Sequence, residues 1–98
     1  MEELLSKVIE NVFDELDSAW LYYKLAVMAK DSGNMELAHS AISTASDELE
    51  HFKWQHEYLE KLTKDRPMES TYLKAVHHRN HNRYQTIKTN IDGFSTKH

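Results

Sequence analysis

The sequence Asp31-Ser32-Gly33-Asn34 (residues 31–34) is the clearest interruption in this chain of 98 residues, which holds two glycines and one proline in all. A glycine suits the left-handed position that follows many helices, and an asparagine can cap the helix that comes next. A connection this short joins two neighbouring helices that run antiparallel. The stretch therefore predicts a helical hairpin.

The helices of this hairpin are predicted over residues 2–32 and 35–64. Both segments carry apolar residues at intervals of three and four, which is the period of an amphipathic helix. The apolar surface of the first helix is wider than one partner helix needs, so we expect it to contact at least two others. The stripes include Val8, Val12, Ala19, Ala26 and Ala29 in the first helix and Ala38, Ala41, Ala45 and Phe52 in the second.

A third helix is predicted over residues 68–91. Pro67 ends the second helix because proline lacks a backbone donor and restricts the residue before it. Asp92 and Gly93 are expected to stop the third helix, which leaves residues 92–98 as a tail. The expected fold class is all-α, in one domain that covers residues 1–98.

Composition excludes several kinds of function. The net charge of −4 argues against a general nucleic-acid binder. The absence of cysteine excludes disulfides, thiolate zinc sites and iron–sulfur clusters within these residues. No apolar run is long enough to cross a membrane, and the first residues lack the features of a signal peptide. A cytoplasmic location is expected.

Two Glu-x-x-His pairs occur in the chain, Glu36/His39 and Glu48/His51. Residues three apart lie on the same face of a helix, so each pair presents a carboxylate and an imidazole together. With ten Glu and seven His in the chain, such a pair is expected by chance, and the motif alone proves nothing. The position of each pair relative to the turn must show which of them could bind a metal.

Distance from the turn favours Glu48 and His51. In an antiparallel hairpin, residues equally far from the turn lie at the same height. Glu15 and His51 both lie about 27 Å from Gly33, and Glu48 lies about 22 Å from it, at 1.5 Å of rise per residue. The three side chains should therefore meet. Glu36 and His39 lie level with residues that are poor metal ligands. We interpret this pair as a solvent-exposed first turn of the helix, with its acidic residue at the positive end of the helix dipole.

Glu15 and Glu48 fall within the apolar stripes, where an ionised carboxylate is costly unless it is paired or bound to a metal. A metal site at Glu15, Glu48 and His51 is the first interpretation. The alternative is a hairpin that is tilted so that both carboxylates reach water.

The residues Glu15, Tyr22, Gly33 and the run Glu48-Leu49-Glu50-His51 resemble the first helix pair of rubrerythrin and related ferritin-like proteins. Residues 25–33 carry the resemblance most strongly, and the match covers about residues 8–62. Full-length members hold two such helix pairs and two Glu-x-x-His motifs, whereas this chain holds one. It is therefore similar to the half-length encapsulated ferritins, whose two-helix subunits dimerise into a four-helix bundle.

This resemblance implies a homodimer in which each subunit supplies Glu15, Glu48 and His51 to a di-iron site, with manganese as the second choice of metal. The implied activity is ferroxidase, the oxidation of Fe(II) by dioxygen or peroxide, for iron storage or detoxification. Tyr22, two turns beyond Glu15, is a candidate for a supporting catalytic role beside the metals, and an ordinary core aromatic is the alternative. An encapsulin shell is a possible partner by this resemblance, but residues 94–98 do not resemble an encapsulin-targeting peptide.

Two other functions stay open. One is a rubrerythrin-like peroxide reductase that uses an external electron donor, since the chain lacks a rubredoxin centre. The other is a helical scaffold protein with a vestigial metal site. A separate cluster, His77, His78 and His81, has chelating spacing, but a solvated polar face or a pH-responsive surface between subunits explains it as well.

Overall fold

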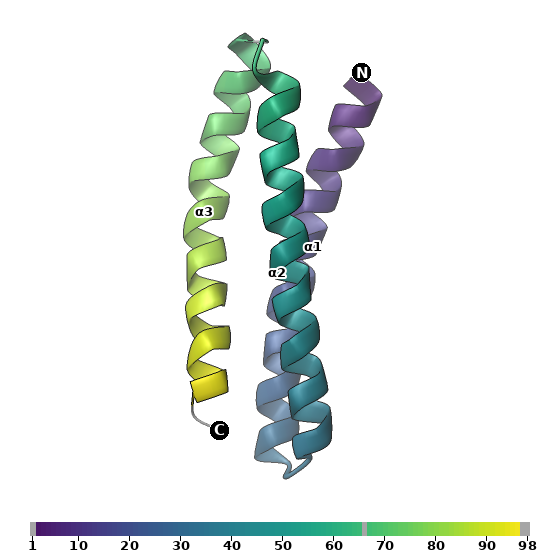
Figure 1. The fold of residues 1–98 in the computed structure, drawn as a ribbon, viewed down its shortest axis with the longest axis vertical. Helices are drawn as coiled ribbons and strands as arrows, with labels where there is room; N and C mark the ends of the chain where they lie inside the picture. Colours follow the sequence, from purple (N-terminus) through teal and green to yellow (C-terminus); the bar gives the residue numbers. More distant parts are fainter. Residues whose placement is uncertain (1, 66, 97–98) are drawn as a thin grey trace.

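The fold is all-helical, as predicted. The computed structural model describes residues 2–65 and 67–96, and it describes side chains there except at residues 2, 5, 62–63, 67–77 and 95–96. Three long helices follow one another along the chain: α1 (Glu2–Asp31), α2 (Met35–Thr63) and α3 (Pro67–Thr96). They run alternately up and down in an elongated molecule of 50 × 21 × 15 Å (Figure 1). Within the described ranges, no helix is long and apolar enough to cross a bilayer.

The turn between α1 and α2 is closed by backbone hydrogen bonds. The amide of Asn34 donates to the carbonyl of Ala29 at 2.8 Å, and the amide of Gly33 donates to the carbonyl of Lys30 at 2.9 Å. This bonding pattern is a Schellman motif, and it places Gly33 at a positive φ of 79° that favours glycine. The side chain of Asn34 then accepts a hydrogen bond from the amide of Leu37 and caps α2.

Small residues line the contact between α1 and α2. Alanines from both helices are buried near the turn, and such small side chains let two helix backbones approach closely. Farther from the turn, α1 and α2 diverge (Figure 1). The buried cluster in this part joins all three helices, with Val12, Leu16 and Ala19 from α1, Ala45, Leu49, Phe52 and Leu59 from α2, and Ile87 and Ile91 from α3.

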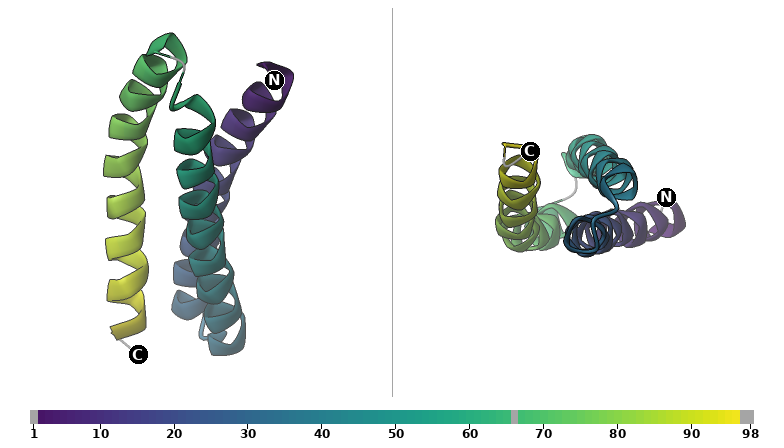
Figure 2. Two further views of the ribbon diagram at one scale, coloured as in Figure 1. Left: turned by 45° about the horizontal axis from the view of Figure 1, so that its top comes forward. Right: turned by 90° about the horizontal axis from the view of Figure 1, so that it is seen from below.

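Helix α3 covers one side of this hairpin. Seen from the end, it lies beside the pair formed by α1 and α2 and leaves the opposite side of the pair uncovered (Figure 2). The ring of Tyr84 in α3 stacks on the ring of Phe52 in α2, with ring centroids 5.4 Å apart. Arg83 bonds to Asp17 of α1. These contacts anchor α3 to both helices of the hairpin.

Helix α3 continues to Thr96, so the predicted stop at Asp92 and Gly93, with a tail over residues 92–98, is wrong. The aromatic ring of Phe94 explains the difference. It is buried among alanines of α1 and α2, and the ammonium of Lys30 lies 5.8 Å from its centroid. Burying a phenylalanine contributes about 1.5–3 kcal/mol, which exceeds the cost of about 1 kcal/mol for one glycine inside a helix.

Candidate metal centre

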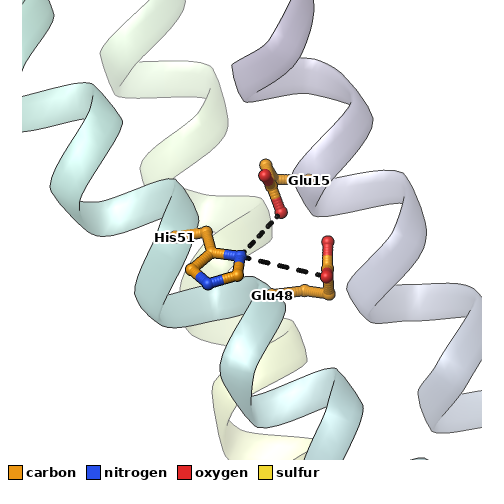
Figure 3. Close-up of side chains that lie close together, drawn as sticks. All are labelled: Glu15, Glu48 and His51. Atoms are coloured by element: carbon orange, nitrogen blue, oxygen red, sulfur yellow. Dashed lines mark ion pairs between the residues drawn. The ribbon is translucent and has the colours of Figure 1, made fainter.

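The structure brings Glu15, Glu48 and His51 together at the middle of the hairpin. Glu15 projects from α1, and the other two residues project from successive turns of α2 (Figure 3). One possible ligand atom from each residue lies within 4.8 Å of the others. Among the described residues, no other group of three His, Asp or Glu side chains meets this condition. This geometry is consistent with the sequence prediction that the three side chains lie at nearly the same height along the hairpin.

The imidazole of His51 lies beside the two carboxylates and turns its Nδ1 atom toward both of them (Figure 3). Its Nδ1 atom is 3.6 Å from Oε2 of Glu15 and 3.9 Å from Oε1 of Glu48. The two carboxylates are mostly buried, with 14% and 23% of their side chains exposed, whereas 59% of the His51 side chain is exposed. The site therefore opens to the surface on the side of the imidazole.

Oxygen Oε2 of Glu15 is the most unusual atom of the group. It is buried, and no donor within the described part of the chain forms a hydrogen bond with it. Burial, followed by the neighbouring carboxylate of Glu48, raises the pKa of Glu15 from 4.5 to about 7, and the imidazole of His51 opposes this rise only in part. In the metal-free protein, this carboxyl is therefore partly protonated near neutral pH.

A cation would satisfy this arrangement. Two carboxylates and one imidazole place possible ligand atoms within 4.8 Å of one another, and a buried acceptor without a donor is costly. A divalent ion supplies the missing positive charge and accepts all three ligands. Oxygen and nitrogen donors without a thiolate suit iron, manganese or zinc. The three residues therefore fit a metal ion, and they supply half of the ligands that a di-metal carboxylate site needs.

The group lies on the side of the hairpin that faces away from α3. In the close-up, the three side chains lie in front of the helices and α3 passes behind them (Figure 3). The contacts of α3 agree with this view, because they involve other faces of the hairpin, at Phe13 of α1 and Phe52 of α2. The three candidate ligands are therefore on the uncovered face of the hairpin.

The remaining sequence candidates lie elsewhere. Tyr22 is exposed and lies seven residues along α1 from Glu15, about 10 Å of helix rise. Glu36 and His39 are exposed at the start of α2. His78 and His81 are exposed on α3. The side chain of His77 falls outside the described residues, so the geometry of that histidine cluster stays open.

Gln55 is a residue of this face that received no role from the sequence. It lies one turn beyond His51 on α2, and its amide oxygen is buried without a hydrogen-bond donor in the described part of the chain. The sequence could have indicated Gln55 through its position in the apolar stripe of α2, because a buried polar side chain needs a hydrogen-bond partner.

Comparison of the chain with family models, with characterised proteins and with solved structures found no match. The resemblance to ferritin-like proteins therefore stays a prediction from the short motifs in the sequence. What the structure adds is independent of that resemblance, namely a Glu/Glu/His group, with two mostly buried carboxylates and an exposed imidazole, that could hold a metal ion.

Proposed function

We propose that two copies of this chain place their uncovered hairpin faces together, bind two Fe(II) ions between them and oxidise this iron with dioxygen or peroxide. The observation that carries the proposal is the buried Oε2 of Glu15, which lacks a hydrogen-bond donor within the described residues while facing Glu48 and His51. Each chain supplies three ligands. Two copies would supply four carboxylates and two imidazoles.

Charge balance supports this stoichiometry. Four carboxylates neutralise two divalent cations, so the filled site carries little net charge when it is enclosed between two subunits. In a single chain, one divalent ion would leave two ligand positions or more to water. Because carboxylates can shift between binding modes, the same ligands can hold the ferrous and the ferric state.

The uncovered face also carries apolar residues that a second copy would bury. Tyr22 and Leu25 follow Glu15 along α1, and Leu37 and Tyr58 flank the metal ligands along α2, all of them exposed in the single chain. Apolar side chains gathered on one face indicate a contact surface. The ligands lie in the middle of this surface, where a subunit contact would exclude water.

The residues have distinct tasks in this proposal. Glu15 and Glu48 would bind the metals through their carboxylates, and His51, the most exposed of the three, would bind through its imidazole. Each pair of ferrous ions would supply two electrons, which together with two protons from solvent would reduce one dioxygen to hydrogen peroxide or one hydrogen peroxide to two waters. Glu15 loses its proton when the metal binds, because its carboxyl is partly protonated near neutral pH beforehand.

Iron binding and oxidation test the proposal. The metal-free protein is titrated with Fe(II) without oxygen, and air is then admitted while the ferric absorbance is followed. We expect one iron per chain and oxidation faster than in buffer alone. Glu48→Gln should lower both iron binding and oxidation to the buffer level, and Glu36→Gln, a matched change in the other Glu-x-x-His pair, should alter neither.

Two outcomes point to the other functions. Oxidation that proceeds with peroxide but not with dioxygen favours a peroxide reductase that draws electrons from another protein. A stable oligomer that binds no iron and accelerates no oxidation overturns the ferroxidase proposal and favours a scaffold.

A further inference from the structure

Gln55 carries a buried hydrogen-bond acceptor that the packing of the hairpin does not explain. It is a partly buried residue of α2, and its Oε1 atom is enclosed without a hydrogen-bond donor from the described residues. A buried acceptor that stays unpaired destabilises the fold, and an apolar side chain of the same size would avoid this cost. The amide of Gln55 is therefore explained only by a donor that the single chain does not supply among these residues.

The unpaired oxygens of the described chain gather on one face of the hairpin. Three buried side-chain polar atoms have no partner among the described residues, namely Oε2 of Glu15, Oε1 of Gln55 and Nδ2 of Asn80. The two oxygens belong to the stripe that carries the candidate metal ligands, whereas the nitrogen belongs to α3. The uncovered face therefore lacks positive charge or hydrogen-bond donors at two neighbouring places.

Gln55 lies on the same face of α2 as two of the candidate ligands. It follows Glu48 by two helical turns, and it follows His51 by one turn, about 6 Å of helix rise. Side chains of a helix lean toward its N-terminus, so Gln55 leans toward the turn that carries His51. Glu15 lies on the antiparallel helix α1, where the same rule makes it lean toward the level of Gln55. The two unpaired oxygens therefore lie at adjoining heights of one surface.

A divalent ion at the candidate centre would answer both deficits. Glu15 would bind the ion directly, and three side chains do not fill the coordination shell of such an ion, so water would complete it. Water can enter on the side of His51, where the group is exposed. An oxygen that accepts a hydrogen bond from this water would lie about 5 Å from the ion, which is the sum of the two bond lengths. This reach suits a side chain that begins one turn beyond His51 and leans toward it.

We propose that Gln55 is a positioning residue of the metal centre, whose amide oxygen accepts a hydrogen bond from the water that completes the coordination of the ion. This inference rests on the proposed function, because it needs a cation at Glu15, Glu48 and His51. The neutral amide suits this task. A third carboxylate in each chain would add two negative charges to the paired site, beyond the four that two divalent cations neutralise.

The metal-free chain bears the cost of the unpaired oxygen, and metal binding removes that cost. Gln55→Met deletes the amide and keeps a side chain of similar length, so it should act in opposite directions on two properties. The metal-free variant should be at least as stable as the natural chain, because a buried acceptor without a donor has disappeared. Its affinity for a divalent ion should fall by about tenfold, because the partners that orient metal ligands have effects of this size.

Co(II) binding and urea unfolding of the full chain test this opposition. Co(II) is titrated while its visible absorbance is followed, and unfolding of the metal-free proteins is measured with a chelator. Gln55→Met should bind Co(II) about tenfold more weakly than the natural chain and should unfold at the same or a higher urea concentration. Gln55→Glu retains an acceptor at the same position, so it should bind Co(II) more tightly than Gln55→Met. Gln85→Met, the same change at an exposed glutamine of α3, should leave binding unchanged.

The possible results separate this inference from the proposed function. Undiminished Co(II) binding in Gln55→Met, together with its loss in Glu48→Gln, overturns the role of Gln55 and retains the metal centre. A metal-free Gln55→Met that unfolds at a lower urea concentration would overturn it as well, because the amide would then serve the fold. Weaker self-association of metal-free Gln55→Met in sedimentation equilibrium would assign the missing donor to the second copy instead. A natural chain that binds no Co(II), or a Glu48→Gln variant that binds it equally well, overturns the metal centre and this inference with it.

Discussion

Glu15 is the residue of the candidate metal centre whose protonation a bound cation would change most. Its side chain is buried between two helices, faces a second carboxylate, and has a pKa of about 7 instead of 4.5. A carboxyl that holds a proton near neutral pH is stable in this surrounding, and under the proposed function it would become a ligand when a cation replaces the proton. Two measurable consequences follow from this exchange.

The first consequence is a pH dependence of the metal-free protein. Since the pKa of Glu15 is higher in the folded chain than in the unfolded chain, the folded chain retains a proton that the unfolded chain releases between about pH 4.5 and 7. This contribution to the free energy of unfolding is complete below the unfolded pKa and is lost as the pH rises through the folded pKa. Urea unfolding with a chelator, compared at about pH 5 and about pH 8, should therefore show a larger fall for the natural chain than for Glu15→Gln. Equal falls in the two proteins would contradict the raised pKa.

The second consequence is proton release on metal binding. At a pH below about 7, the incoming ion must displace the proton of Glu15, so affinity for a divalent ion should rise with pH and level off above that value. Calorimetric titrations with Mn(II), which does not oxidise readily, measure the released protons in buffers of different ionisation enthalpy. Proton release should shrink as the pH rises through about 7. Release that stays constant across this range would mean that Glu15 is not the group displaced.

Sequence reasoning could place the residues of the candidate metal centre but not their protonation. Glu15, Glu48 and His51 were predicted to meet because helix rise and turn position fix their heights. The orphaned oxygen of Glu15 and the buried amide of Gln55 depend on side-chain packing, which a periodic pattern does not specify.

At the scale of the helices, a strong local signal was confirmed and a weak one was overridden. Gly33 and Asn34 provide both halves of a turn, a left-handed position and a cap, and the structure uses both. Asp92 and Gly93 offer only poor helix propensity, and one buried ring, Phe94, is enough to carry α3 past them. Tertiary packing therefore decides the end of α3.

The two glycines should respond oppositely to alanine. Gly33 has a φ of +79°, so Gly33→Ala should lower the free energy of unfolding by about 1–2 kcal/mol, although the new methyl group would contact nothing. Gly93 lies inside α3, and a Cβ atom there would also meet nothing within 4 Å. Gly93→Ala should therefore raise the free energy of unfolding by about 0.5–1 kcal/mol. Chemical denaturation of both variants checks this, and a destabilised Gly93→Ala would show that α3 does not continue through this residue.

At the scale of the whole molecule, the three helices leave one face of the hairpin uncovered, and Glu15, Glu48 and His51 lie on it (Figures 2 and 3). Leu37 lies eleven residues before Glu48, which is three turns of helix, so it shares this face. Met35 lies near it in the first turn of α2 but on another side of the helix. The two side chains are similarly exposed, at 41% and 38%.

This pair gives a matched test of the proposed dimer. Leu37→Glu should weaken self-association by at least about tenfold, because it would bury a charge between the two subunits, and it should reduce iron oxidation in parallel. Met35→Glu should change neither property. An acidic residue in the first turn of a helix interacts favourably with the helix dipole, so neither variant should lose folded structure.

Sedimentation equilibrium measures association, and the ferric absorbance measures oxidation in the same samples. If Leu37→Glu dissociated no more readily than Met35→Glu, the two hairpins would not meet through the face that carries Glu15, Glu48 and His51. If it dissociated and still oxidised iron at the natural rate, one chain would be sufficient for the reaction.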